Sequence, residues 1–314
     1  MFQAIRRFGI RPRNNSPIQW SLTDHVPSPA FDTGCTYCQP SSFPSDKQID
    51  YERPLNKSSA IPIKHVMVLT TKDNKMDQFE SRIEDWKGTL ANEIQKLKTS
   101  NKKLHLAEGT SISSIVLQSH NLVLREFGVN ADNANEQLVF IYPEMKAVKF
   151  DIAHTDQFRK KYISSKRRQP VYNPFVKVTE NDEIGNEEDD GVIVESKNFK
   201  EYKVEKDLIV TCGHTKRDIR CGELGPLITA EFDKVLTKEK VRDQFYVGQI
   251  THIGGHAFAG NVLYYPKECE SSRDFIWYGR VFPKDVQGLV EETVNGKRVI
   301  KGLFRGDLNH FVKK

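Results

Sequence analysis

Two pairs of potential metal ligands stand out in the second half of the chain. Cys212 and Cys221 enclose eight residues, and His252 and His256, thirty residues further on, enclose three. Two thiolates and two imidazoles make a complete four-ligand set for a zinc ion or an iron–sulfur cluster. Each pair adjoins a predicted β-strand, so the strands can hold both loops at one end of a sheet. We therefore expect these residues to meet in one metal site.

The spacing leaves the kind of site open. Eight residues between the cysteines is wide for a structural zinc site, whose paired ligands usually stand two to four residues apart. A Rieske centre, suggested by Cys212-Gly213-His214, needs a second loop with cysteine and histidine, and no histidine follows Cys269 closely. His214 is therefore expected to support the site or lie at the surface. Two buried thiols and two hydrogen-bonded histidines without metal are the remaining alternative.

Two glycines, Gly254 and Gly255, separate the histidines. A double glycine disfavours the helix that would place His252 and His256 on one face, and it lets the backbone approach a bound group closely. The pattern therefore favours a loop folded around the site, with both glycines in its immediate surroundings.

Positive charge gathers within the cysteine loop, at Lys216, Arg217 and Arg220. These cations could stabilise a reduced site or bind an acidic redox partner. The alternative is a set of ordinary surface charges with Asp218 as a local partner.

A further cysteine pair, Cys35 and Cys38, forms a CxxC motif, which can be a redox dithiol or half of a metal site. Thioredoxin-type motifs follow a strand and open a helix, whereas this one lies in a loop with Pro40 close behind. The motif suggests a dithiol that exchanges with protein thiols, and a structural or incidental pair is the alternative.

The segments that must position these residues indicate an α/β protein. In the first half the apolar patterns predict three strands and one helix, and in the second half they predict the order βαβββα. The first-half strands are at 64–71, 111–118 and 137–143, with a helix at 82–100. The second-half strands are at 206–212, 244–252, 260–266 and 274–281, with helices at 224–240 and 284–294.

The length of 314 residues suggests about two domains. We predict a leader, an N-terminal α/β domain, an acidic linker and a C-terminal domain that carries the metal site. Their expected bounds are 1–23, 24–178, 179–195 and 196–314.

The first 23 residues contain four arginines, Arg6, Arg7, Arg11 and Arg13, and no acidic residue. This composition is typical of a mitochondrial transit peptide. Four of the chain's five net positive charges lie there, which leaves +1 for residues 24–314. The balance, together with the lack of a nucleic-acid motif, argues against a nucleic-acid partner, and no apolar run is long enough to cross a membrane.

Three passages of the second half resemble a known family: CGHTKRDIRCG, THIGGHAFAGNVLYYP and IWYGRVFPKDVQGLVEE. They are similar to the thioredoxin-like [2Fe–2S] ferredoxins and, more closely, to the sucrase/ferredoxin-like family of fungi and plants. In its bis-histidinyl, non-Rieske branch, histidines replace the last two of the four cysteine ligands. The resemblance implies a thioredoxin-like C-terminal domain with one [2Fe–2S] cluster per chain, held by Cys212, Cys221, His252 and His256.

The charge of such a ligand set predicts its redox behaviour. Two thiolates and two neutral imidazoles leave an oxidised [2Fe–2S] site neutral, whereas four thiolates leave it a dianion, so its reduction potential should be higher. Metal binding also acidifies the outer imidazole N–H, so reduction can be coupled to proton uptake. We expect both histidines to bind the same iron, because three intervening residues do not easily reach the other.

The expected function is that of a mitochondrial electron carrier with protein redox partners, acting in redox homeostasis, rather than an enzyme with a substrate of its own. One alternative is a thiol–disulfide protein that uses Cys35 and Cys38 and has a structural metal site. Another is a zinc-stabilised interaction module. The sequence contains no phosphate-binding glycine loop, nucleophile elbow or recognisable glycosidase signal.

Overall fold

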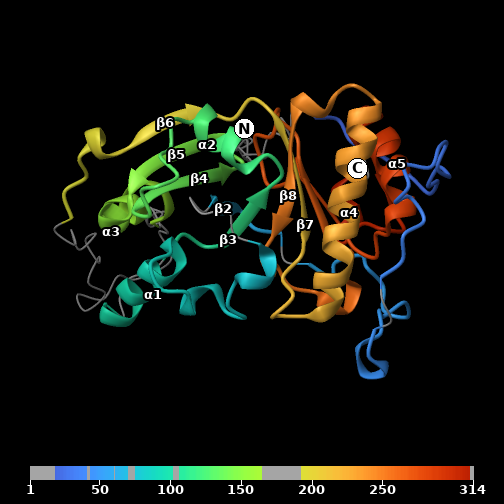
Figure 1. Cartoon of the computed structure of the whole chain (residues 1–314), viewed down its shortest axis with the longest axis horizontal. Coiled ribbons are helices and arrows are strands. Elements are labelled where there is room, and N and C mark those ends of the chain that lie inside the picture. Colours follow the sequence, from blue (N-terminus) through green and yellow to red (C-terminus); the bar gives the residue numbers. More distant parts are fainter. Residues whose placement is uncertain are drawn as a thin grey trace, which may run out of the picture.

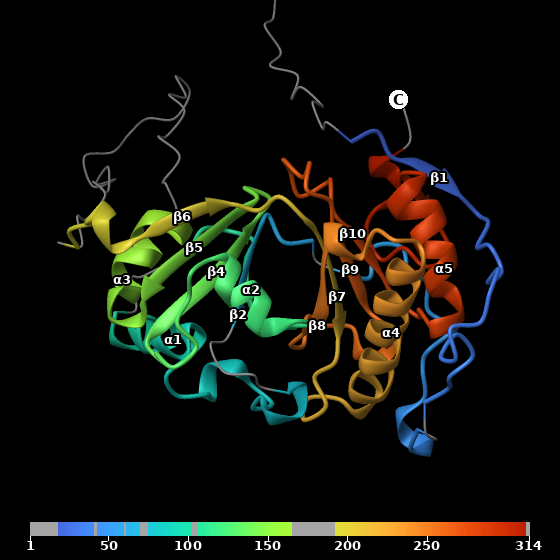
Figure 2. The same cartoon turned by 45° about the horizontal axis from the view of Figure 1, so that its top comes forward.

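The computed structural model describes residues 18–40, 43–59, 61–69, 75–101, 106–164 and 192–311. Its centre is a mixed sheet of nine strands in the order β10-β9-β7-β8-β3-β2-β4-β5-β6 (Figure 1). A separate parallel pair, β1 with β11, lies beside α5 (Figure 2). The protein is therefore a mixed α/β structure, as the sequence predicts.

The elements have the following bounds. The strands are β1 (Ser21–Thr23), β2 (Lys64–Leu69), β3 (Thr110–Leu117), β4 (Glu136–Tyr142), β5 (Lys146–Asp151), β6 (Lys200–Lys203), β7 (Asp207–Cys212), β8 (Phe245–Ile250), β9 (Val262–Tyr265), β10 (Ile276–Tyr278) and β11 (Arg298–Ile300). The helices are α1 (Leu90–Ser100), α2 (His120–Glu126), α3 (Thr155–Phe158), α4 (Ile219–Lys238) and α5 (Val286–Leu289), which continues as a π-helical turn (Val290–Asn295).

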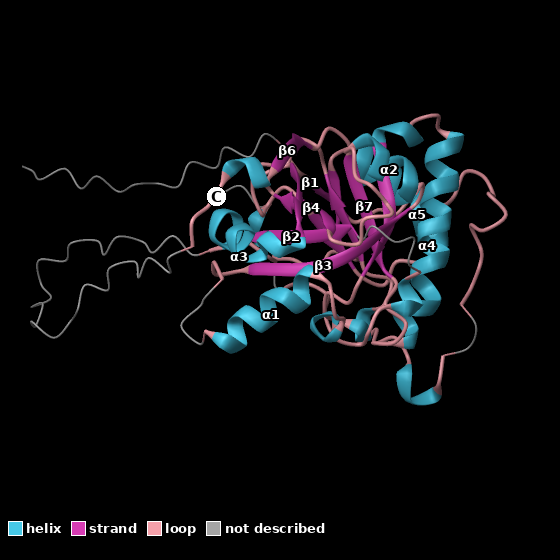
Figure 3. Ribbon diagram, turned by 60° about the vertical axis from the view of Figure 1, so that its left-hand side comes forward, coloured by secondary structure: helices cyan, strands magenta, loops and turns pink. Residues whose placement is uncertain are grey.

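The apolar runs of the central strands bury both faces of the sheet. In β2, Met67 and Leu69 belong to the larger core, whereas Val66 and Val68 belong to a second core that includes Leu90 of α1. Successive side chains of a strand point to opposite faces, so one continuous apolar run supplies both cores. Helix α1 accordingly lies on the other side of the sheet from α2 (Figure 3).

Strands from both halves of the chain share this sheet because β3 pairs with β8 in antiparallel register, with Leu117 opposite Gly248. A Cβ atom at Gly248 would lie 2.2 Å from the backbone oxygen of Val116, so a glycine is needed for the strands to approach this closely. The domain bounds 24–178 and 196–314 stay predictions.

The order β7, α4, β8, β9, β10, α5 is the βαβββα order predicted for the second half. The predicted helix 82–100 is wrong in its first part, because α1 begins only at Leu90. Gly88 has a φ of +78°, which interrupts a right-handed helix, and the Thr89 hydroxyl then caps α1 by accepting a hydrogen bond from the Asn92 N–H at 3.3 Å.

Helix α4 begins five residues earlier than predicted. The carboxylate of Asp218 caps it by accepting a hydrogen bond from the Arg220 N–H at 3.0 Å. Cys221 therefore lies in the first turn of α4, and Pro226 lies in the helix interior.

The N-terminal segment runs along the outside of α5 and α4 (Figure 2). The side-chain oxygen of Gln287 accepts a hydrogen bond from the Ala30 N–H at 2.9 Å, and Thr36 donates to Glu231 of α4 at 2.7 Å. The four arginines of the predicted leader and the acidic stretch 179–190 lie outside the described residues. The last residues of the predicted leader, Ser21–Thr23, form β1.

Among the described residues, no helix is long and apolar enough to cross a membrane.

Candidate metal centre

The loops that carry the predicted ligands leave the same edge of the sheet. Strands β7 and β8 are parallel, and Cys212 at the end of β7 lies opposite Ile250 at the end of β8. Strand β9 is antiparallel to β7 and begins at this edge, where Val262 pairs with Thr211. The loop after β7 and the loop that joins β8 to β9 therefore meet, as their places in the sequence predict.

Three of the four predicted ligands come together at this edge. One sulfur each from Cys212 and Cys221 and one ring nitrogen of His252 lie within 4.8 Å of one another. Both cysteines are buried, and His252 is half-buried. The His252 Nδ1 atom is buried without a hydrogen-bond partner in the described part of the chain. This donor set is one that zinc and iron–sulfur sites use, so the residues fit a bound metal.

The pKa values of the two cysteines are shifted in opposite directions. A hydrogen bond from Cys221 and the nearby imidazole of His252 hold the pKa of Cys212 well below its ordinary value, despite burial. The hydrogen bond to Cys212 and burial together raise the pKa of Cys221. The lowered pKa favours the thiolate form of Cys212, the form in which cysteine binds metals.

His256 lies outside this group of three. It is exposed, and its ring centroid is 5.4 Å from that of His252, with 30° between the ring planes. No helix joins the two histidines, because Gly254 and Gly255 have φ angles of +89° and +71° in the left-handed region. The fourth predicted ligand therefore lies beside the group, on its solvent side.

His214 and Arg217 differ in their relation to the site. His214 is buried, and its Nδ1 atom accepts a hydrogen bond from the backbone N–H of His252 at 3.1 Å, so it supports the ligand loop. Burial lowers the pKa of His214. Arg217 is exposed, and Asp218 pairs with Arg220 rather than with it, at 2.9 Å.

Cys35 and Cys38 lie elsewhere, in a turn against α4. The Cys38 N–H donates to the Cys35 carbonyl at 3.0 Å, and Thr36 of the same turn donates to the buried carboxylate of Glu231. Burial and a hydrogen bond with Cys38 raise the pKa of Cys35 to about 11. Cys269 is buried, and its thiol donates to the Ser271 carbonyl at 3.5 Å.

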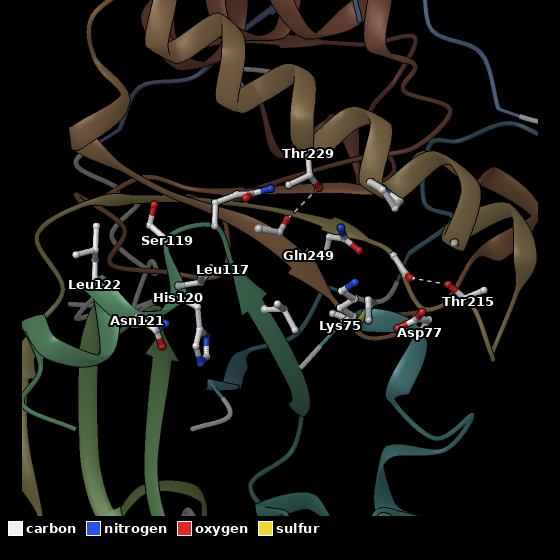
Figure 4. A pocket seen from close by; sticks show the side chains of 17 residues that line it. Lys75, Asp77, Leu117, Ser119, His120, Asn121, Leu122, Thr215, Thr229 and Gln249 are labelled. Carbon is white, nitrogen blue, oxygen red and sulfur yellow. Dashed lines mark hydrogen bonds between the residues drawn. The ribbon is translucent and has the colours of Figure 1, made fainter. Parts of the chain in front are cut away.

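A cavity of about 750 Å³ borders the cysteine loop (Figure 4). Gly213 and Gly222, the residues that follow the two cysteines in the chain, lie in its wall, and Thr215 and Gln249 project beside them. The cavity brings solvent close to the chain next to both cysteines.

Two further residues at this edge, Asn261 and Arg305, contact the glycines between the histidines. Neither was expected at the site from the sequence, since asparagine and arginine are not typical metal ligands and Arg305 is far along the chain from both ligand loops.

The family model for sucrase/ferredoxin-like proteins matches residues 55–306. The chain belongs to the sucrase/ferredoxin-like family. Its relatives in that family include proteins named altered inheritance of mitochondria protein 32. The one from Meyerozyma guilliermondii is 38% identical over 92% of this chain and 96% of its own length. Those from Debaryomyces hansenii and Clavispora lusitaniae are each 37% identical over 91% of this chain, and over 97% and 96% of their own lengths.

No solved structure matches this sucrase/ferredoxin-like chain significantly. The family resemblance expected from the three sequence passages is confirmed, and all three passages lie within the matched range.

Proposed function

We propose that the protein is a one-electron carrier that binds one [2Fe–2S] cluster through Cys212, Cys221, His252 and His256. The observation that carries the proposal is the approach of the Cys212, Cys221 and His252 donor atoms to within 4.8 Å, with the His256 ring alongside. Membership of the sucrase/ferredoxin-like family supports it.

The ligand residues divide into a buried and an exposed side. A [2Fe–2S] cluster supplies one-electron chemistry when it is bound. Cys212 and Cys221 are buried on the inner side, while His256 presents its ring to solvent, where a partner protein or a proton can reach it. Two neutral imidazoles in place of two thiolates make the site less negative, which favours reduction.

A mitochondrial association follows from the names of the relatives, each an altered inheritance of mitochondria protein. The basic leader at 1–23 agrees with it. We place the protein's electron transfer in mitochondrial redox homeostasis, with proteins as its donors and acceptors.

A redox titration followed by electron paramagnetic resonance tests this function. We expect reversible uptake of about one electron per chain and, between about pH 6 and 9, a potential that falls by up to ~59 mV per pH unit where a proton accompanies the electron. No reversible signal would overturn the proposal, whereas a pH-independent potential would overturn only its proton-coupled part. The Cys269→Ser variant, which alters a cysteine outside the ligand set, is expected to titrate like the wild type.

A mononuclear zinc site is the second candidate, because the donor atoms lie so close together. Two sulfurs bound to one zinc ion are at most about 4.6 Å apart, given Zn–S bonds of about 2.3 Å. The separation of 4.8 Å or less is therefore compatible with a single ion. The protein would then be a zinc-stabilised interaction module.

The thiol–disulfide alternative depends on Cys35 and Cys38. With its pKa raised to about 11, Cys35 is mostly protonated at neutral pH, whereas the attacking species in disulfide exchange is the thiolate. This observation favours the metal site over the dithiol as the redox centre.

A further inference from the structure

Arg305 is a buried cation that has no carboxylate partner among the described residues. Its side chain is 1% exposed. Its guanidinium donates to the hydroxyl and carbonyl of Ser58 at 3.1 and 2.9 Å, to the Gly254 carbonyl at 3.2 Å and to the side-chain oxygen of Asn261. It also lies 4.9 Å from the centre of the Trp277 ring. All these partners are neutral, and within the described ranges Arg305 makes no ion pair with a carboxylate.

An unpaired buried charge is costly, since the protein interior solvates it poorly. Burial accordingly lowers the pKa of Arg305 to about 10, and Cys212 and Cys221, where they carry negative charge, act in the opposite direction. Arg305 therefore remains charged at neutral pH, and the thiolates that these cysteines would form on binding a metal are the anionic groups that favour its charge.

The same guanidinium packs against the histidine loop. A Cβ atom at Gly255 would lie 2.1 Å from a terminal nitrogen of Arg305, so only glycine leaves room for this contact. At Gly255, the group that approaches the backbone closely is therefore the Arg305 side chain. Next to it, the side-chain amide of Asn261 donates to the Gly255 carbonyl at 3.2 Å. Two successive carbonyls between the histidines, at Gly254 and Gly255, are therefore held by buried side chains.

Asn261 also connects this loop to the cysteine side. Its backbone carbonyl accepts a hydrogen bond from the Cys212 N–H at 2.9 Å. Arg305 itself is fixed by its own backbone, because its N–H donates to the carbonyl of Trp277, in the middle of β10, at 2.9 Å. The contacts form a continuous path from the C-terminal segment through the histidine loop to the first cysteine.

We propose that Arg305 is a positioning residue of the metal centre: with Asn261 it holds the His252–His256 loop in place, and it supplies a permanent buried positive charge that stabilises the thiolate ligands and the added electron. The inference rests on the proposed function where the added electron is concerned. The parts of the proposal that concern the histidine loop and the thiolates apply to any metal at this site.

Three variants separate charge from packing. Arg305→Met removes the charge and the hydrogen bonds, Arg305→Lys keeps the charge, and Ser58→Asp leaves Arg305 in place but sets a carboxylate beside its Nε atom. Arg242→Met is the matched control. It removes the same charge as Arg305→Met, but Arg242 pairs with Asp233 near the far end of α4. Two properties are measured on the full chain: the midpoint potential and the rate at which a chelator removes the bound metal.

We expect Arg305→Met and Ser58→Asp to lower the equilibrium constant for reduction about tenfold, which is ~59 mV for one electron. The midpoint potential of Arg305→Lys should remain closer to that of the wild type than the potential of Arg305→Met does. Metal release should be at least several-fold faster in Arg305→Met. Arg242→Met should match the wild type in both properties.

Each outcome bears on the proposal. Wild-type potential and release rate in a folded Arg305→Met variant would overturn it, and so would an equal shift in Arg242→Met. If Arg305→Met does not fold, an unchanged potential in Ser58→Asp overturns the charge part. A wild type that holds zinc instead of iron refutes the electron-carrier function, and the release rates then still decide on Arg305. A wild type without any metal overturns both.

Discussion

At the scale of single residues, the proposed chemistry lies in polar side chains that the fold buries or half-buries at one edge of the sheet. The candidate ligand residues were predictable because cysteine and histidine indicate metal binding by their type and spacing. Arg305 and Asn261 were not, since an arginine and an asparagine are common at surfaces and only the folded chain brings them to the histidine loop. Another buried group, His65, has no part in the metal site and affects stability instead.

His65 is buried between Tyr265 and Ser113, with hydrogen bonds of 2.6 and 3.0 Å. Burial lowers its pKa to about 3, whereas an unfolded histidine has a pKa of about 6.5. The unfolded state therefore binds more protons below pH 6.5, and the contribution of His65 to stability is complete above that pH and is lost as the pH falls toward 3.

This linkage predicts that His65 alone accounts for about 2 kcal/mol of the stability lost between pH 7.5 and pH 5. In a His65→Gln variant, which does not titrate, the loss over this interval should be smaller by about that amount, whatever the variant's stability at pH 7.5. Urea denaturation at both pH values gives the two differences. An equal loss in the variant and the wild type would refute the linkage.

At the scale of elements, β2, β3, β4 and the order of the second half followed from the sequence, because short apolar runs such as Leu208–Val210 are typical of buried strands. The first residues of α1 and α4 did not follow from it. They depend on local backbone features, the positive φ at Gly88 and the Asp218 cap, which compete with apolar periodicity. The three-residue strands β1 and β11 are too short for any periodic signal, and only long-range pairing defines them.

The junction between β3 and β8 predicts a strong effect at Gly248. A Gly248→Ala methyl group would collide with the Val116 carbonyl and separate the strands, so we expect a loss of stability of about 1–3 kcal/mol or more. Gly302→Ala is the control, because a Cβ atom there meets nothing within 4 Å and its φ is not in the left-handed region. Its expected effect is within about 1 kcal/mol of zero. Denaturant unfolding compares the two, and equal stabilities would contradict the close contact at the junction.

At the scale of the whole molecule, one sheet joins both halves of the chain, and the candidate metal site lies at an edge to which three segments contribute. The cysteine and histidine loops were expected there, because parallel β7 and β8 end together. The third segment arrives through the bridge between Tyr278 and Phe304, which sets Arg305 beside the site. This contact could not be predicted from the sequence, because Arg305 follows His256 by almost 50 residues.

The proposed function depends on what the four candidate ligand residues hold. The most direct test is the iron, acid-labile sulfide and zinc content of the protein purified without oxygen. We expect red-brown protein with about two iron and two sulfide per chain, unchanged in Cys269→Ser and lost in Cys212→Ser. Colourless wild-type protein with about one zinc and no sulfide would contradict the central claim.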